Sequence, residues 1–113
     1  MPSTIVLTPI APGEIETICF DYGMLLQDGP LTVTSVLSIA CTVLRGTDAS
    51  ASSRIIALPV ISESRETGVA SSAVLQQFGN MLDGVTYLLQ CTAVASDGQR
   101  LILPAHIMCV QIS

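Results

Sequence analysis

The chain has no lysine and few charges of either sign. Its 113 residues include four arginines against nine aspartates and glutamates, which gives a net charge of −5 at pH 7. Proteins that bind nucleic acid or anionic membranes place lysine and arginine against phosphates. The charge balance therefore argues against nucleic-acid partners and against docking on a membrane.

Aromatic residues are also scarce, since the chain has no tryptophan, two phenylalanines and two tyrosines. Half of the residues are hydrophobic and only 12% are charged, whereas about a quarter is usual. Two interpretations of this composition stay open. Either the apolar residues fill a large core, or part of the surface is buried against other subunits.

Residues that could carry chemistry are few. His106 is the single histidine, and no G-x-S-x-G turn or glycine-rich phosphate loop occurs, so we expect His106 at the surface or in an interface. The carboxylate pair Glu14/Glu16 is expected on the outward face of a strand, and the pair Glu63/Glu66 in an exposed loop. We therefore predict no catalytic, cofactor-binding or metal-ligating residues, and no enzyme.

The four cysteines, Cys19, Cys41, Cys91 and Cys109, are far apart in sequence and form no C-x-x-C motif. A zinc site would need three or four of these thiols to converge from separate strands. Each lies in an apolar, strand-like run, which favours small buried hydrophobic residues with reduced thiols. A single disulfide between facing strands is the alternative.

No targeting segment is visible. The first 14 residues contain three prolines and no basic residue, unlike a signal peptide. The longest weakly polar run, residues 31–44, is too short to cross a bilayer. We expect the protein to stay in the compartment where it is made.

The dominant pattern is one of short β-prone runs separated by turn residues. A strand is preferred to a helix for residues 73–82, despite an apolar spacing that would also fit a helix. The expected strands are residues 4–8, 14–20, 31–44, 54–61, 73–82, 85–95 and 100–112.

Several of these runs carry irregularities. The run 31–44 is long for a strand, so a bulge or break is expected near Ser38, with Val33, Leu37 and Cys41 on one face. Pro59 predicts an edge position or a bulge, and Pro104 is expected to interrupt the last strand. Asp28-Gly29-Pro30 and residues 46–53 are predicted turns or loops.

The clearest local unit is a C-terminal hairpin. Asp97-Gly98 stands between two alternating runs, which is the strongest short hairpin signal. Tyr87 follows the Asp83-Gly84 turn at the start of a late strand, as in the tyrosine corner of Greek-key sandwiches. We interpret Tyr87 as a determinant of the fold.

These strands predict an all-β protein of one domain, an immunoglobulin-like two-sheet antiparallel sandwich of seven or eight strands. The sandwich is expected to span residues 14–113. Residues 1–13 form either its first strand or an arm that lays a strand along a neighbour's sheet edge.

A resemblance covers residues 12–112. The ending DGVTYLLQCTAVASDGQRLILPAHIMCV resembles the G-x-x-Y, apolar strand, S-D-G, apolar strand ending of small structural proteins of tailed phages. The front half is similar too, with P-x-E, F-D-Y, a D-G turn and a T-V-T-S strand. The family it most resembles is the phage fibre-tail adaptor group. The chain departs from that pattern in lacking an early tryptophan and in having four cysteines.

The resemblance implies a virion structural protein, a tail or neck adaptor subunit that links the tail to a fibre or ring protein. It would be made and assembled in the bacterial host cytoplasm, occur in multiple copies in a symmetric particle, contact other virion proteins and need no cofactor. The alternative within the virion is a capsid decoration or cement protein. The alternative from another class is a carbohydrate-binding module, which would need exposed aromatics.

Overall fold

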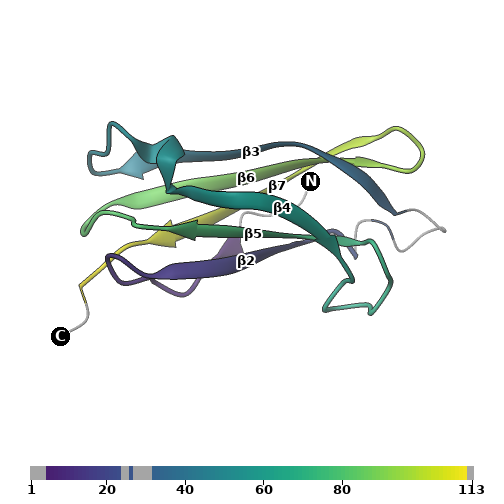
Figure 1. The fold of residues 1–113 in the computed structure, drawn as a ribbon, viewed down its shortest axis with the longest axis horizontal. Helices are drawn as coiled ribbons and strands as arrows, with labels where there is room; N and C mark the ends of the chain where they lie inside the picture. Colours follow the sequence, from purple (N-terminus) through teal and green to yellow (C-terminus); the bar gives the residue numbers. More distant parts are fainter. Residues whose placement is uncertain (1–4, 24–25, 27–31, 112–113) are drawn as a thin grey trace.

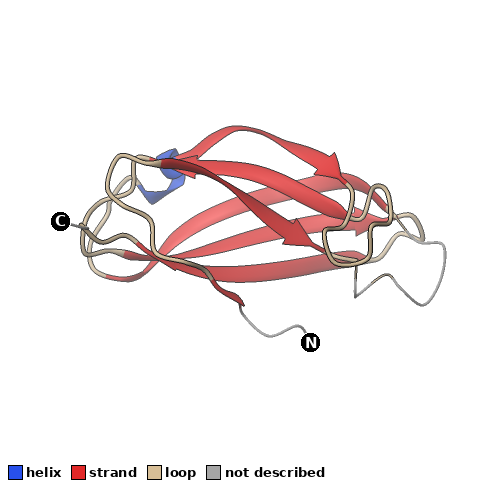
Figure 2. Ribbon diagram, turned by 90° about the horizontal axis from the view of Figure 1, so that it is seen from below, coloured by secondary structure: helices blue, strands red, loops and turns tan. Residues whose placement is uncertain are grey.

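The computed structural model describes residues 5–23, 26 and 32–111, and these form two stacked β-sheets (Figure 1). The view from below shows the strands running along the long axis, with loops gathered at both ends (Figure 2). The strands are β1 (Ile5–Val6), β2 (Ile15–Asp21), β3 (Val33–Arg45), β4 (Ile55–Ser62), β5 (Ala73–Gly79), β6 (Thr86–Ala95) and β7 (Arg100–Met108), and a short 3₁₀ helix, η1 (Ala51–Arg54), precedes β4.

The strand order confirms the predicted sandwich. One sheet has the order β1-β7-β6-β3 and the other the order β2-β5-β4. All neighbours are antiparallel except β1, which pairs in parallel with β7. Placing the second, fourth and fifth strands in one sheet, opposite the third, sixth and seventh, is the immunoglobulin arrangement.

The core lies between the sheets and is supplied by alternate residues of each strand. On β6 every second residue is fully buried, as the sequence predicts. The rings of Phe20 and Phe78 meet edge to face across β2 and β5, with centroids 6.3 Å apart. The four aromatic residues of the chain, Phe20, Tyr22, Phe78 and Tyr87, are all buried.

The corner expected at Tyr87 is present. The Tyr87 hydroxyl accepts a hydrogen bond from the Leu82 backbone N–H at 3.0 Å, which closes the turn before β6. It also donates to the Asp48 carboxylate at 2.7 Å. A second tyrosine, Tyr22, donates from its buried hydroxyl to the Cys91 carbonyl at 2.7 Å. This bond ties the end of β2 to β6, so it links the two sheets.

The long strand β3 is bulged, as predicted, but not at one place only. Its pairing with β6 shifts between Val33 and Ser35, between Val36 and Ser38, and again near its end. The middle shift lies where the break was expected. The prediction that Leu37 shares the buried face is wrong, because the bulge turns Leu37 out and places Val36 against the core instead.

The prediction of which face of β2 points outward is wrong by one residue. Ile18 and Phe20 point into the core, so Glu16 shares their face and is half-buried at the end of the sandwich. Glu14 precedes the strand and is exposed. Cys19 therefore points outward and is only partly buried, whereas the other three cysteines are buried as predicted. Each face of β2 offers one isoleucine, so the phenylalanine decides, because burying its ring removes more apolar area from water than burying a threonine and a cysteine.

The C-terminal hairpin is confirmed, with Gly98 in the left-handed region at φ 91° and its N–H bonded to the Ala95 carbonyl. The interruption predicted at Pro104 is wrong, because β7 continues through it opposite Gln90. On its other side β7 is paired only from Ala105 onward, by the short β1. Up to that point β7 borders no strand there, and such an edge tolerates a proline.

The segment before β2 lies on its own molecule's sheet. The Leu7 N–H donates to the His106 carbonyl, and Ile10 exchanges backbone hydrogen bonds with Met108 and Val110. The Ile10 side chain is completely buried. Residues 5–10 thus run as a short strand and an extended continuation along β7. The turn predicted at Asp28-Gly29-Pro30 lies outside the described residues.

Candidate assembly surface

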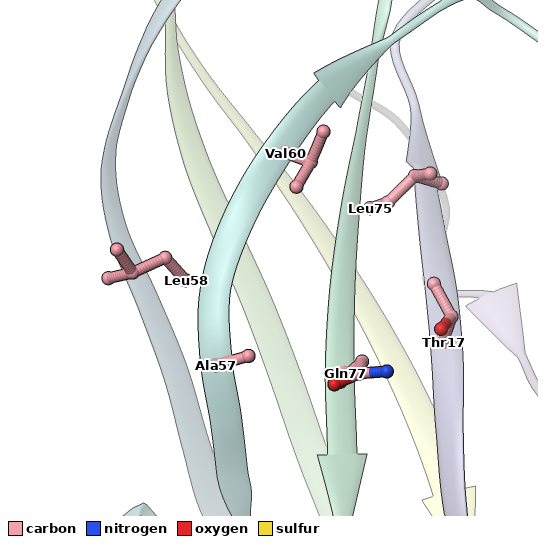
Figure 3. A pocket seen from close by; sticks show the side chains of 6 residues that line it. All are labelled: Thr17, Ala57, Leu58, Val60, Leu75 and Gln77. Atoms are coloured by element: carbon pink, nitrogen blue, oxygen red, sulfur yellow. The ribbon is translucent and has the colours of Figure 1, made fainter.

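The outer face of the three-stranded sheet exposes several large apolar side chains. Antiparallel sheets with one buried face normally present polar residues to solvent on the other. Here Leu58, Val60 and Ile15 are 85%, 58% and 55% exposed. No ionisable side chain lies among the residues that line the middle of this face, which are Thr17, Ala57, Leu58, Val60, Leu75 and Gln77 (Figure 3).

At one end of this face, a glycine lets side chains from the two outer strands meet over the middle strand. Gly79 of β5 points its missing side chain outward, and a Cβ there would lie 2.7 Å from side-chain atoms of both Ile15 and Ile56. The two isoleucines therefore cover the strand where a larger residue would hold them apart. The apolar surface is continuous from β2 to β4 at this end.

A large bulge in β4 shapes the other side of the face. Ile56 pairs with Gln77 and Val60 with Leu75, so three residues of β4 stand opposite Gln76 alone. Ala57, the first of the three, has φ 67°, a left-handed conformation that a residue with a side chain rarely adopts. Figure 3 shows the result: Ala57 lies on the side toward Gln77, and Leu58 points off the free edge of β4. The bulge and edge position expected from Pro59 are both confirmed.

Gln76 holds the bulge from inside the sandwich. Its side chain is 1% exposed, and Nε2 donates to the Ile56 carbonyl at 2.8 Å and to the Ala57 carbonyl at 3.0 Å. These bonds replace the strand-to-strand bonds that the bulge removes. The Oε1 atom is buried and has no hydrogen-bond partner among the described residues. A buried, half-satisfied amide and a left-handed alanine are unfavourable features, and both lie at the bulge from which Leu58 projects.

Leu58 separates two hollows. On one side is the depression in the outer face, about 270 Å³ in volume, with Leu75 and Gln77 in its lining. On the other side is a groove of about 280 Å³ between β3 and β4, where Leu37 and Ile39 face Ala57 and Pro59. Leu58 and Ala57 line both. We call the outer face, Leu58 and this groove together the assembly surface.

The polar residues singled out in the sequence do not converge. His106 is half-buried on β7 beside β1, on the other sheet from the assembly surface. Glu14 accepts a bond from the Ala11 N–H at 2.7 Å and so closes a local turn. Glu63 and Glu66 are exposed in the loop after β4, as expected.

Two aspartates instead organise loops. The Asp21 carboxylate accepts bonds from the Ser64 hydroxyl and from the Arg65 and Glu66 backbone N–H groups, so it holds the loop between β4 and β5. Partial burial opposes its ionisation, but the hydrogen bonds from Ser64 and the loop backbone outweigh burial and lower the pKa of Asp21.

The second, Asp48, lies in the loop after β3 and binds Arg54 in a bidentate pair at 2.9 and 3.0 Å. The Asp48 side chain is 2% exposed. The hydrogen bonds from Arg54 and then from Tyr87 hold the pKa of Asp48 well below its usual 3.8. Arg54 immediately precedes β4, so this cluster fixes where the bulged strand begins. Its bonds go to parts of the fold, and neither Asp48 nor Arg54 lines the two hollows of the assembly surface.

Burial also raises the pKa of the four cysteine thiols. It raises the pKa of Cys41 to about 12 and the pKa of Cys91 to about 11, and it raises the pKa of Cys19 and Cys109 as well. All four thiols are therefore protonated near neutral pH. Each is unpaired in the structure, which agrees with the prediction of free thiols.

Comparison with models of protein families, with curated proteins and with solved structures finds no match to this chain. Within the described residues, no three histidine, cysteine, aspartate or glutamate side chains gather as metal ligands would. No helix in that part of the chain has the length and hydropathy needed to cross a bilayer.

Sequence reasoning missed the roles of Gln76 and Leu58 in shaping the assembly surface, although the sequence holds a signal for each. Gln76 alternates with Val74 and Phe78, so a polar residue stands at a core-facing position of the strand. Pro59 indicates a bulge but does not say which neighbour turns outward. The exposure of Leu58 depends on the three-to-one mismatch with β5, which only the paired strands define.

Proposed function

We propose that this chain is a structural subunit of a tailed-phage particle, a tail or neck adaptor that joins the tail to a fibre or ring protein. One observation carries the proposal, namely that both hollows of the assembly surface are lined by uncharged and mostly apolar residues, on a chain with net charge −5. Solvated monomers rarely expose continuous apolar patches, and where they do, the patch commonly serves contact with another molecule. The family resemblance over residues 12–112 supplies the virion and the adaptor role.

The same surface bears on the interpretation of the composition. Large apolar side chains are exposed on the outer face of β2, β5 and β4, and the residues that line the middle of that face carry no ionisable group. This favours the interpretation that part of the surface is buried against other subunits. The partners are then other virion proteins, met during assembly in the host cytoplasm, with no nucleic acid, membrane or cofactor required.

A non-catalytic role is part of the proposal. The Asp21 and Asp48 clusters donate and accept their bonds within the fold, and each fixes a loop. The alternative of a carbohydrate-binding module needs aromatic rings displayed for stacking on sugars. Because all four aromatic side chains of this chain are buried, that alternative is less favoured than assembly.

Immunogold labelling of purified phage particles tests the function. Antibodies against the chain should label the neck or tail, and mass spectrometry of the same particles should detect it at several copies per particle. Labelling over the capsid would support a decoration protein instead of an adaptor. Absence from particles that contain every other structural protein of the phage would reject a virion role.

A further inference from the structure

We propose that the free edge of β2 receives an extended, basic strand from another protein, which becomes the outer strand of the three-stranded sheet. This deepens the proposed function and rests on it only for naming the partner as a neighbouring protein of the particle. Three features of the molecule support the docking itself: the unpaired backbone of β2, the regularity of that strand and the charges beside it.

The backbone of β2 has hydrogen-bonding groups that point away from its own sheet. β2 is the outermost strand and pairs with β5 alone (Figure 1). In an antiparallel pair, every second residue directs its N–H and C=O away from the partner strand. The Asn80 N–H donates to the Glu14 carbonyl, and the Tyr22 N–H donates to the Ser72 carbonyl, so the even-numbered residues face β5. The groups directed to the free edge are therefore those of Ile15, Thr17, Cys19 and Asp21.

The other sheet edges are obstructed, whereas β2 is regular. β3 shifts its register three times, β4 has a bulge and Pro59, and β1 covers β7 from Ala105 onward. Such irregularities and covers keep an edge from pairing with other chains. The seven residues of β2 pair with β5 without a shift and include no proline. An incoming strand of the usual length, about five or six residues, therefore finds an unbroken template at β2.

The charges beside this edge favour a basic partner. Glu14 and Glu16 lie at one end of β2, and Asp21 and Glu66 lie at the other, where Arg65 offsets one of the charges. The whole chain also carries a net charge of −5. Complementary charge speeds the encounter of two proteins and excludes partners of like charge. An acidic strand, or a second acidic molecule, is therefore disfavoured at this edge.

Glu16 narrows the choice of partner further. Its side chain lies on the core-facing side of β2 and is half-buried, so a strand docked on the edge would cover its carboxylate. A covered charge is strongly destabilising unless an opposite charge pairs with it. The partner must therefore bring an arginine or lysine to Glu16.

A second copy of the chain cannot supply that cation from a strand. The chain has no lysine. None of its arginines lies in the middle of a strand, since Arg45 ends β3, Arg54 precedes β4, Arg65 lies in a loop and Arg100 begins β7. The occupant is thus a different protein.

Amide hydrogen exchange of the isotope-labelled full chain tests whether the edge is free. The amides of Thr17 and Cys19 should exchange at least about 10-fold faster than those of Ile18 and Phe20, which bond to β5. Equal protection of the two sets would mean that the edge of β2 is already covered, and it would overturn the proposal.

A nonapeptide that alternates arginine with valine and threonine is the probe for the partner. It should bind at least about 10-fold more tightly at low salt than the same peptide with glutamate in place of arginine, and added salt should weaken it. Binding should also protect the amides of Thr17 and Cys19. An arginine peptide N-methylated at alternate amides keeps its charge but cannot complete the ladder, so it should not protect them. Equal binding by these two arginine peptides, or protection at β3 or β4 instead, would overturn the proposal.

Two variants and a matched control locate the contact. Thr17→Pro removes an outward N–H and leaves the bonds to β5, and it should weaken the arginine peptide about 10-fold. Glu16→Gln should weaken it by a similar factor. Asp97→Asn makes the same change in net charge at an exposed turn of the other sheet, and it should alter binding less than about twofold.

Circular dichroism checks that the variants fold, and the N-methylated peptide tests the same contact on the unaltered chain. Equal weakening by Glu16→Gln and Asp97→Asn would reject the site on β2. A chain that is present in particles but does not bind the arginine peptide would reject this proposal and leave the proposed function standing. Binding at β2 by a chain that is absent from particles would support the docking site and reject the virion role.

Discussion

The Tyr87 hydroxyl joins three parts of the sandwich: the start of β6, the turn before it and the loop after β3. It accepts from the Leu82 N–H and donates to Asp48, whose carboxylate also holds Arg54. Replacing a hydroxyl that has two partners leaves both partners short of a bond inside a poorly solvated corner. The cost is therefore larger than that of an ordinary surface hydroxyl.

We expect Tyr87→Phe to lower the free energy of unfolding by about 1 kcal/mol, and by up to about 3 kcal/mol if the Leu82 amide finds no water. Urea denaturation followed by circular dichroism measures the change. A loss of only a few tenths of a kcal/mol would mean that the corner bond adds nothing to stability. The ring itself is retained, so the result reports the hydroxyl and not the packing.

The Asp48 cluster makes stability depend on pH in a defined direction. Its folded pKa lies below the ordinary value of 3.8, so the folded state favours the charged carboxylate. The stabilisation is fully present above pH 3.8 and is lost as the pH falls through the folded pKa. In Asp48→Asn this contribution is absent. The difference in unfolding free energy between wild type and Asp48→Asn should therefore be constant near pH 6 and shrink progressively below pH 4.

Denaturation series at several pH values measure that difference. If the difference between wild type and Asp48→Asn stayed constant down to pH 2, the lowered pKa of Asp48 would be refuted.

The thiols should be free but slow to react. Burial raises the pKa of Cys41 to about 12 and of Cys91 to about 11, so the reactive thiolate is rare at pH 7. A thiol probe should count four groups in the denatured, unreduced protein. In the folded protein Cys19 should react first, because it alone is partly exposed. A count near zero after denaturation would show that the cysteines are oxidised or paired.

Among the elements, β1 and its continuation show how little pairing is needed to complete a sheet. Only Ile5 and Val6 are in strand register with β7, yet Ile10 further along is fully buried, and its N–H and carbonyl bond to Met108 and Val110. Its side chain closes the end of the core beside Cys109. The segment thus adds to stability mainly by packing and less by the length of its ladder.

Ile10→Ala should lower the free energy of unfolding by about 2–5 kcal/mol, the usual cost of truncating a buried isoleucine. Ile15→Ala is the control at a residue of the same type that is about half exposed, and it should cost less than about 1 kcal/mol. Thermal and urea denaturation provide the comparison. Equal effects of the two substitutions would mean that residues 5–10 are not part of the folded sandwich in solution.

The positions of the strands in the sequence were predictable. Which face of each strand points into the core was harder to predict. The β6 pattern is unambiguous, because Val85, Tyr87, Leu89, Cys91 and Ala93 alternate with more polar residues. In β2 both faces carry apolar residues, so Ile15 and Ile18 compete for the core and the sequence pattern alone does not choose. Burial of Phe20 decides the facing, and it sends Ile15 to the assembly surface.

For the whole molecule, we expect a far-UV circular dichroism spectrum dominated by β-structure with almost no helical signal. The described residues contain seven strands and a single 3₁₀ turn of four residues. Because the two sheets share one core, heating should give one cooperative transition, identical by circular dichroism and by tyrosine fluorescence. A strong helical double minimum, or two separate transitions, would contradict the fold.

At the same scale, the class of fold, the positions of the strands, the final hairpin and the Tyr87 corner could be predicted from the amino-acid sequence, because these features depend on local alternation and turn chemistry. The shortage of charge left two interpretations open, a large core or a surface buried against other subunits. The positions of the exposed apolar residues followed only from the paired sheets. Leu58 turns outward, Leu37 leaves the core, and Gln76 supports the bulge, because strands far apart in sequence pair out of step. The register between distant strands is a property of the assembled sheets, so it cannot be obtained from either strand alone.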